Sequence, residues 1–140
     1  MSSPNTQRAV KLLTAGLVGG HLGTLVCVVV FALLGGAKGL LCSLIPAFTV
    51  IVFFTIGHGV LVMVADADPK VVLFASLSSY LGRVALLAIA LELTLSNESF
   101  RAQLDIPALV ITTFLVANAW LAAEFWRYRR LRIPVYDSQE

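Results

Sequence analysis

Long apolar runs occupy most of the chain, and polar residues are concentrated in the short segments between them. Four runs follow one another: Leu13–Leu34, Leu40–Val64, Val71–Leu95 and Ile106–Trp126. A membrane-spanning helix needs about 20 mostly apolar residues at a rise of 1.5 Å per residue, so each run is long enough to cross a bilayer. The apolar residues are continuous rather than alternating, which favours helices over the strands of a barrel. The pattern predicts an all-α membrane protein with four transmembrane helices.

The composition agrees with a single integral membrane domain over residues 1–140. Hydrophobic residues make up 59% of the chain and charged residues 13%, and the mean hydropathy is +0.91. These values do not describe a soluble domain, and four spans leave no room for a separate catalytic or nucleotide-binding domain. The first run is longer than the apolar core of about 7–15 residues in a signal peptide, so we expect it to be a span.

Short connectors separate the runs, at residues 35–39, 65–70 and 96–105. Connections of this length make sequence neighbours antiparallel, so the chain should form two antiparallel hairpins. With four spans, both termini then lie on the same side of the membrane. The second connector contains Asp66, Asp68 and Pro69, which favour a turn; a cation site is the weaker alternative, because further oxygen ligands are lacking.

Lys and Arg residues are divided unevenly between the two sides that this topology defines. Seven lie on the side of the termini: Arg8, Lys11, Lys70, Arg127, Arg129, Arg130 and Arg132. Two, Lys38 and Arg101, lie on the other side, and Arg83 lies within a span. Because cationic loops stay in the cytoplasm, we expect both termini to be cytoplasmic.

Residues 127–140 follow the last span as a basic tail. Its start combines aromatic and cationic residues that can anchor it at the membrane surface, namely Trp126, Arg127, Arg129, Arg130 and Arg132. Each cation near an anionic leaflet contributes about 1 kcal/mol, so anionic lipids are the expected partner of this tail. Since the cluster begins directly at the membrane surface, we expect no nucleic-acid partner.

Arg83 interrupts the third run at its midpoint. Ser79 and Tyr80 precede it at helical spacing, so the three side chains form a polar stripe. A charge at this depth costs at least about 2.5–3.5 kcal/mol on insertion scales. Arg83 is therefore expected either to snorkel to the cytoplasmic interface, or to contact protein, water or a partner inside the membrane.

Other polar residues lie at a comparable depth on the neighbouring runs. At 1.5 Å per residue from the cytoplasmic edge, His21 and Asn118 are roughly 12 Å deep and His58 is roughly 9 Å deep. We expect an intramembrane polar seam formed by Arg83, Ser79, Tyr80, His21, His58 and Asn118. Glu124, roughly 3 Å deep beside Trp126, is expected to anchor the helix at the interface, with pairing to Arg83 as the alternative.

The two histidines leave three interpretations open. Paired axial histidines hold haem in some four-helix membrane proteins, and glycines flank both His21 and His58. The histidines could instead relay protons, or pack as hydrogen-bonded side chains, which is more usual. No cation pair suited to haem propionates is evident, so we expect no cofactor.

No arrangement typical of catalysis is present in the sequence. A Ser/His/Asp or thiol/histidine arrangement and zinc-ligand spacing are lacking, and Cys27 and Cys42 lie at different depths without a CxxC spacing. We therefore expect no enzymatic activity and no metal site.

The first run carries two overlapping GxxxG motifs, formed by Gly16, Gly19, Gly20 and Gly23. Small residues one turn apart let another helix approach closely within a bilayer. We expect this face either to pack against the second helix of the same chain or to dock another membrane protein.

Two segments resemble the protein I (subunit I) family of bacterial F-type ATP synthases. Residues 79–87, SYLGRVALL, are similar to that family's third span, where a cation interrupts an apolar run, and residues 130–137, RLRIPVYD, resemble the tails of actinobacterial members. The layout of four spans with cytoplasmic termini also resembles the family over the full length. The resemblance implies an accessory protein of the bacterial plasma membrane that assists assembly of the rotor ring of subunit c. A role in supplying divalent cations is also implied.

The alternative to an assembly factor is a small transporter or channel for a proton or divalent metal. Its path would be the polar seam, and because four helices are few for a pore, this function would require a homo-oligomer. In the assembly interpretation Arg83 either pairs with a carboxylate of subunit c or orders the protein's own bundle.

Overall fold

The computed structural model describes residues 3–131 and is helical over almost all of that range. The elements in chain order are α1 (Pro4–Met63), α2 (Pro69–Ser96), α3 (Glu98–Arg101) and α4 (Ile106–Arg130). By length and composition, α1, α2 and α4 are each able to cross a membrane. The predicted all-α class is confirmed for the described residues, and the long apolar helices indicate a membrane protein.

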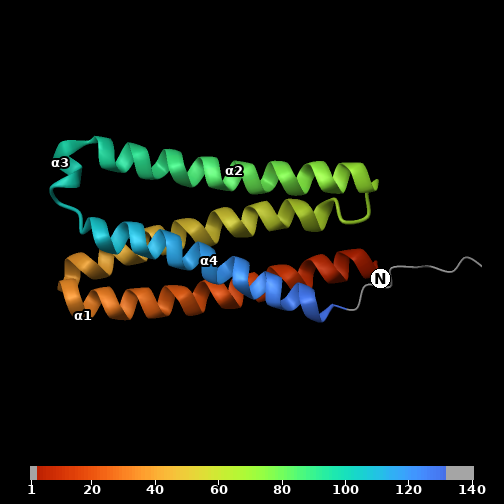
Figure 1. Ribbon diagram of the computed structural model, residues 1–140, viewed down its shortest axis with the longest axis horizontal. Helices are drawn as coiled ribbons and strands as arrows, with labels where there is room; N and C mark the ends of the chain where they lie inside the picture. Colours follow the sequence, from red (N-terminus) through yellow and green to blue (C-terminus); the bar gives the residue numbers. More distant parts are fainter. Residues whose placement is uncertain (1–2, 132–140) are drawn as a thin grey trace, which may run out of the picture.

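The long helix α1 reverses direction at Gly36, so that residues 4–35 and 37–63 form two antiparallel arms (Figure 1). Gly36 has φ 57° and ψ −140°, a conformation that residues with a side chain rarely adopt. At Gly39, a Cβ atom would overlap the carbonyl oxygen of Phe31, so the start of the second arm touches the end of the first through backbone. The expected connector at residues 35–39 is therefore a tight helical reversal rather than a loop.

Each long helix begins with the same local chemistry. The side chains of Ser3, Asp68 and Asp105 accept hydrogen bonds from backbone N–H groups of the first turns of α1, α2 and α4, at 2.8–3.1 Å. Proline stands at the first or second position of each of these helices, where its missing N–H costs nothing. Asp68 thus lies in the turn that the sequence predicts, and it also caps α2.

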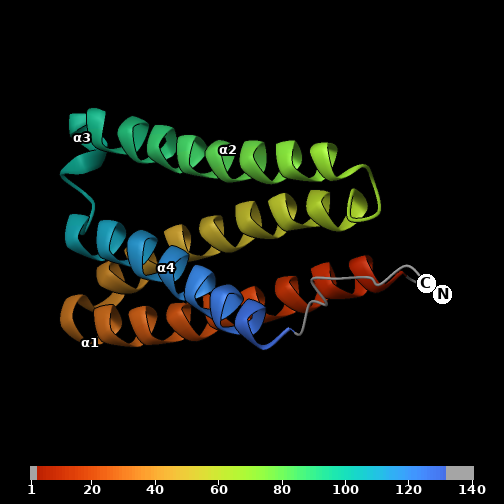
Figure 2. The same cartoon turned by 45° about the vertical axis from the view of Figure 1, so that its right-hand side comes forward.

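The packed core lies between α4 and the two arms of α1. Its buried side chains are Cys27 from the first arm, Ala47, Val50 and Phe54 from the second arm, and Val116 and Trp120 from α4. In both views α4 runs obliquely over α1, starting beside the Gly36 reversal and ending in the half of the molecule that holds the N-terminus (Figures 1 and 2). We call the end with the reversal and α3 the α3 end, and the opposite end the N-terminal end.

The glycine face of the first arm is covered by α4. A Cβ atom at Gly19 would lie 2.5 Å from Cβ of Ala123, and one at Gly23 would lie 2.9 Å from Cβ of Ala119. Gly16 and Gly20 face the ring of Trp120 in the same way. The face therefore packs internally, but against the last helix rather than against the second predicted span, which forms the second arm of α1.

Helix α2 lies at the outside of the bundle, next to the second arm (Figures 1 and 2). It packs against α1 and α3, whereas α4 packs mainly against α1. The expected second hairpin would consist of α2 and α4. The two helices follow each other in the sequence, but each packs mainly on α1 or α3 rather than on the other. Of the described side chains of α2, only that of Arg83 is buried. The attachment of α2 thus centres on a charged residue.

Candidate functional site

Arg83 crosses from α2 to the second arm of α1 and is only 6% exposed. Its Nη1 lies 3.0 Å from Nδ1 of His58. Its Nε donates to the carbonyl oxygen of Ser79 at 3.1 Å, and its Nη2 donates to the hydroxyl of Ser79 at 3.2 Å. Ser79 in turn donates from Oγ to the carbonyl oxygen of Gly57 at 3.1 Å, which gives a second bond between the two helices.

The other ring nitrogen of His58 reaches α4. His58 Nε2 lies 2.6 Å from Oε1 of Glu124, and the two side chains are 9% and 15% exposed. The indole N–H of Trp120, one turn before Glu124, donates to the same carboxylate oxygen. Arg83, His58 and Glu124 therefore form one continuous chain across α2, α1 and α4, which we call the Arg–His–Glu chain.

The donors and acceptors fix the state of the imidazole. A guanidinium has no acceptor, so Nδ1 of His58 must accept the hydrogen bond from Arg83. The ring proton is then on Nε2, where it is donated to the carboxylate of Glu124. A neutral His58 lies between the positive Arg83 and the negative Glu124, so the Arg–His–Glu chain has no net charge. This compensation is what lets an arginine remain at the middle of an apolar helix.

The rings of Phe54 and Trp120 contact the Arg–His–Glu chain. Cζ of Arg83 lies 5.0 Å from the centroid of the Phe54 ring, within the range of a cation–π contact. The Phe54 and Trp120 rings meet edge to face at 5.6 Å. His58 and Trp120 have their ring centroids 5.9 Å apart. As whole residues, Arg83 and His58 are only 6% and 7% exposed, and hydrogen bonds are stronger in such weakly polar surroundings.

Two glycines make the space that this arrangement needs. A Cβ atom at Gly57 would lie 2.8 Å from both Nε of Arg83 and Oγ of Ser79. A Cβ atom at Gly16 would overlap the indole of Trp120 and lie 2.9 Å from Oε1 of Glu124. The first arm contributes no charged group to the Arg–His–Glu chain, but its glycine face leaves room for Trp120 and Glu124.

The predicted polar seam is only partly assembled. Arg83, Ser79 and His58 meet as described. His21 is exposed, with Nδ1 2.7 Å from the carbonyl oxygen of Leu17, and Asn118 is exposed and donates to the carbonyl oxygen of Phe114 at 2.8 Å. Tyr80 is 47% exposed. These three residues lie at the predicted depth, but their side chains are exposed rather than directed to Arg83, so they are not part of the site.

Glu124 lies at a place that differs from the one predicted from the sequence. We expected it to anchor the helix at the interface, but its carboxylate turns inward to His58 and Trp120. The spacing Trp120-x-x-x-Glu124 carried the signal, because it places an indole N–H and a carboxylate on one face of a helix. The snorkelling interpretation of Arg83 is wrong for the same reason, since its cation is paired inside the bundle.

The arrangement also bears on the haem interpretation of the histidines. Both ring nitrogens of His58 are engaged by side chains, so neither is free to bind iron. His21 lies on the first arm and binds its own helix. The two histidines are not paired across a shared cavity. Among the described residues, no group of three or more His, Cys, Asp or Glu side chains is placed to hold a metal ion.

The predicted surface anchor continues α4 as a helix up to Arg130. Arg127, Arg129 and Arg130 occupy its last turn, where cations interact favourably with the helix dipole. Cζ of Arg130 lies 3.8 Å from the centroid of the Trp126 ring. Arg132 and the rest of the predicted tail lie outside the described residues.

Comparisons of the chain with protein-family models, with curated proteins and with solved structures found no match.

Proposed function

We propose that this protein crosses the bacterial plasma membrane four times, with both termini in the cytoplasm. The two arms of α1 count as separate crossings, because at 1.5 Å per residue they are about 48 Å and 40 Å long and a hydrocarbon core is about 30 Å thick. The cations support the orientation. Arg8, Lys11 and Lys70, together with the basic turn that ends α4, lie at the N-terminal end.

We propose further that it is a non-catalytic accessory protein of the F-type ATP synthase that assists assembly of the subunit c ring. The resemblance of residues 79–87 to protein I supports this function. In the fold, the observation that supports this function is that α2 is attached to α1 at few points and exposes apolar side chains. Arg83 and the hydrogen bond from Ser79 to Gly57 hold the helix, while its apolar side chains Leu73 and Phe74 remain 70% and 74% exposed.

This geometry favours one of the two roles considered for Arg83. Its hydrogen-bond donors are directed to His58 and Ser79, so Arg83 orders the bundle rather than waiting for a carboxylate of subunit c. The glycine face is filled by α4 and is not open to a partner. The exposed face of α2 is then the surface on which a helical hairpin of subunit c docks, through apolar contacts within the membrane.

Ring yield in cells that depend on this protein tests the proposal. Arg83→Leu should lower the amount of intact ring on native gels at matched expression, and Arg83→Lys should retain part of it. The pair Leu73→Ala and Phe74→Ala should also lower the yield. Leu33→Ala with Leu34→Ala is the matched control, because these side chains are 82% and 78% exposed on the first arm. Equal yields for all variants would contradict both the assembly role and the docking face.

A proton transporter acting as an oligomer is the second candidate. The observation in its favour is that His58 joins a carboxylate to a guanidinium within the apolar region, which is the type of chain that relays protons. Proteoliposomes loaded with a pH-sensitive dye test it. Proton flux that disappears in His58→Leu and persists in His21→Leu would establish transport. No flux above that of empty liposomes would exclude it.

A further inference from the structure

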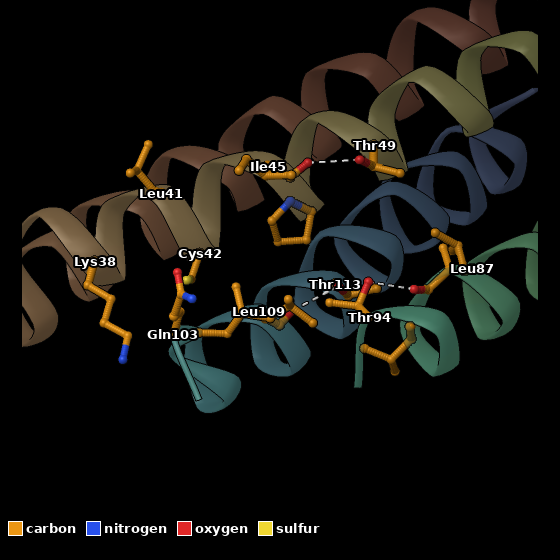
Figure 3. A pocket seen from close by; sticks show the side chains of 14 residues that line it. Lys38, Leu41, Cys42, Ile45, Thr49, Leu87, Thr94, Gln103, Leu109 and Thr113 are labelled. Atoms are coloured by element: carbon orange, nitrogen blue, oxygen red, sulfur yellow. Dashed lines mark hydrogen bonds between the residues drawn. The ribbon is translucent and has the colours of Figure 1, made fainter. Parts of the chain in front are cut away.

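A cavity of about 420 Å³ lies between the second arm of α1, α2 and α4 (Figure 3). Its lining residues on α2, at positions 87–94, come between Arg83 and α3 in the sequence. Lys38 and Gln103 lie at one end of it, and Leu87 lies at the other. From Lys38 to Thr49 the helix rises about 16 Å, close to the half-thickness of a hydrocarbon core of about 30 Å. The cavity is thus about one lipid leaflet deep, and its volume is within the usual range of about 300–1,000 Å³ for ligand pockets.

The walls of the cavity present almost no free polar group. Leucine, isoleucine, alanine and proline side chains make up most of the lining. Its three threonines, Thr49, Thr94 and Thr113, donate their hydroxyls to carbonyl oxygens one turn back in their own helices, at 2.7–2.9 Å. Their hydroxyls are therefore already engaged within their own helices. A sugar, a nucleotide or a hydrated ion would lose its hydrogen bonds here, whereas a hydrocarbon chain would lose nothing.

The α3 end of the cavity is different, because it carries a cation. Lys38 is exposed and lines this end. Among the described residues, no carboxylate forms an ion pair with its amine, although the carboxylate of Asp105 lies at the same end, beside Gly35 and Gly39. The amide of Gln103 lies at the same end. A hydrophobic cavity whose end carries an ammonium group without an ion-pair partner among the described residues matches an amphiphile with an anionic head group.

We propose that this cavity binds one acyl chain of an anionic phospholipid from the leaflet at the α3 end, with the phosphate at Lys38. The acyl chain fills the space that separates α2 from α4. This accounts for a bundle in which α2 buries only Arg83 among its described side chains, since lipid completes the packing that protein leaves open. The site is separate from the basic turn that ends α4, which lies at the other end of the bundle.

Native mass spectrometry of the purified full chain tests the site. The protein is delipidated in detergent and offered equimolar phosphatidylglycerol and phosphatidylcholine with identical acyl chains. We expect one retained lipid with about a fivefold preference for phosphatidylglycerol, which corresponds to the contribution of one interfacial cation. Lys38→Gln should abolish the preference while a chain is still retained. Lys70→Gln, the same change at the N-terminal end of α2, should leave the preference intact.

A second pair of variants tests where the chain lies. Ala90→Phe fills the cavity from α2 and should reduce retention of both lipids severalfold, whereas Val84→Phe adds the same ring to an α2 position that is 49% exposed outside the cavity. Thr94→Leu fills the same space one turn further on, in case Ala90→Phe does not fold. Equal retention of the two lipids by the parent protein, or full retention in both cavity-filling variants, would overturn the proposal.

Discussion

His58 accepts a hydrogen bond from Arg83 at Nδ1, across 3.0 Å, and this contact determines the tautomer of the buried imidazole. With its proton on Nε2, the ring can bind Glu124 on a third helix segment. One neutral side chain thus connects a cation and an anion that lie on α2 and α4. The relationship explains why a charge at the centre of an apolar helix is compatible with a stable bundle.

Loss of His58 should therefore destabilise the bundle. His58→Leu leaves the guanidinium of Arg83 without its side-chain acceptor on α1 and removes a donor from Glu124, so we expect a loss of about 1–3 kcal/mol in the free energy of unfolding. The double variant with Arg83→Leu should cost less than the sum of the single changes, because it leaves no unpaired cation. Steric trapping in bicelles measures these energies. His21→Leu is the control and should cost little, because His21 is exposed; equal losses for the two histidines would refute a special role for His58.

The glycine face should tolerate no side chain at Gly16. Gly16→Ala places a methyl group in the indole of Trp120 and so displaces Glu124 from His58. We expect destabilisation, seen as a lower thermal midpoint and a changed fluorescence of Trp120. Gly59→Ala provides the comparison, because a Cβ atom there meets nothing within 4 Å. Alanine in an open helical position should stabilise by about 0.5–1 kcal/mol relative to glycine. Similar behaviour of the two variants would contradict the close packing of α4 on the first arm.

The loop after α1 should show a pH-dependent contact with the N-terminus. Hydrogen bonds from Ser3 and Thr6 lower the pKa of Asp66 below its ordinary value. Because the folded-state pKa is the lower one, the contact stabilises the fold above the ordinary pKa of about 3.9 and this contribution is lost as the pH falls through the folded-state pKa.

A carbon-detected NMR titration of the Asp66 carboxyl group checks this expectation. Thr6→Val removes one donor, 2.9 Å from Oδ2, and should raise the pKa of Asp66 toward its ordinary value. Thr14→Val is a control on the same arm, since Thr14 donates only to the carbonyl oxygen of Lys11. An unchanged pKa in Thr6→Val would show that the N-terminus does not hold this loop.

The proposed orientation predicts which introduced thiols react from outside the cell. In a background without Cys27 and Cys42, Asn97→Cys should be labelled by a membrane-impermeant maleimide and Ser138→Cys should not. The expectation rests on the excess of cations at the N-terminal end. Labelling of Ser138→Cys alone would reverse the orientation, and labelling of both would mean that the number of crossings is wrong.

The helices could be predicted from the sequence, because hydrophobic runs and turn residues act locally. The predicted run Ile106–Trp126 lies within α4, and Asp68 and Pro69 start α2 as turn chemistry requires. A central cation on the third run, with Ser79 one turn away, was also visible from spacing alone. Depth along a helix follows from residue number at a fixed rise, so His58 could be placed near the level of Arg83.

Which side chains meet depends on how the helices pack, and this could not be predicted from the sequence. Depth does not fix azimuth, so His21 and Asn118 were as plausible as His58 until the rotation of each helix was known. The reversal at Gly36 and the oblique course of α4 set these rotations, and both depend on contacts between distant residues such as Gly39 with Phe31. Glu124 turns inward because Gly16 and Gly20, which lack side chains, leave room for Trp120 beside it. The cavity next to Lys38 has the same origin: α4 packs on α1 and leaves α2 apart.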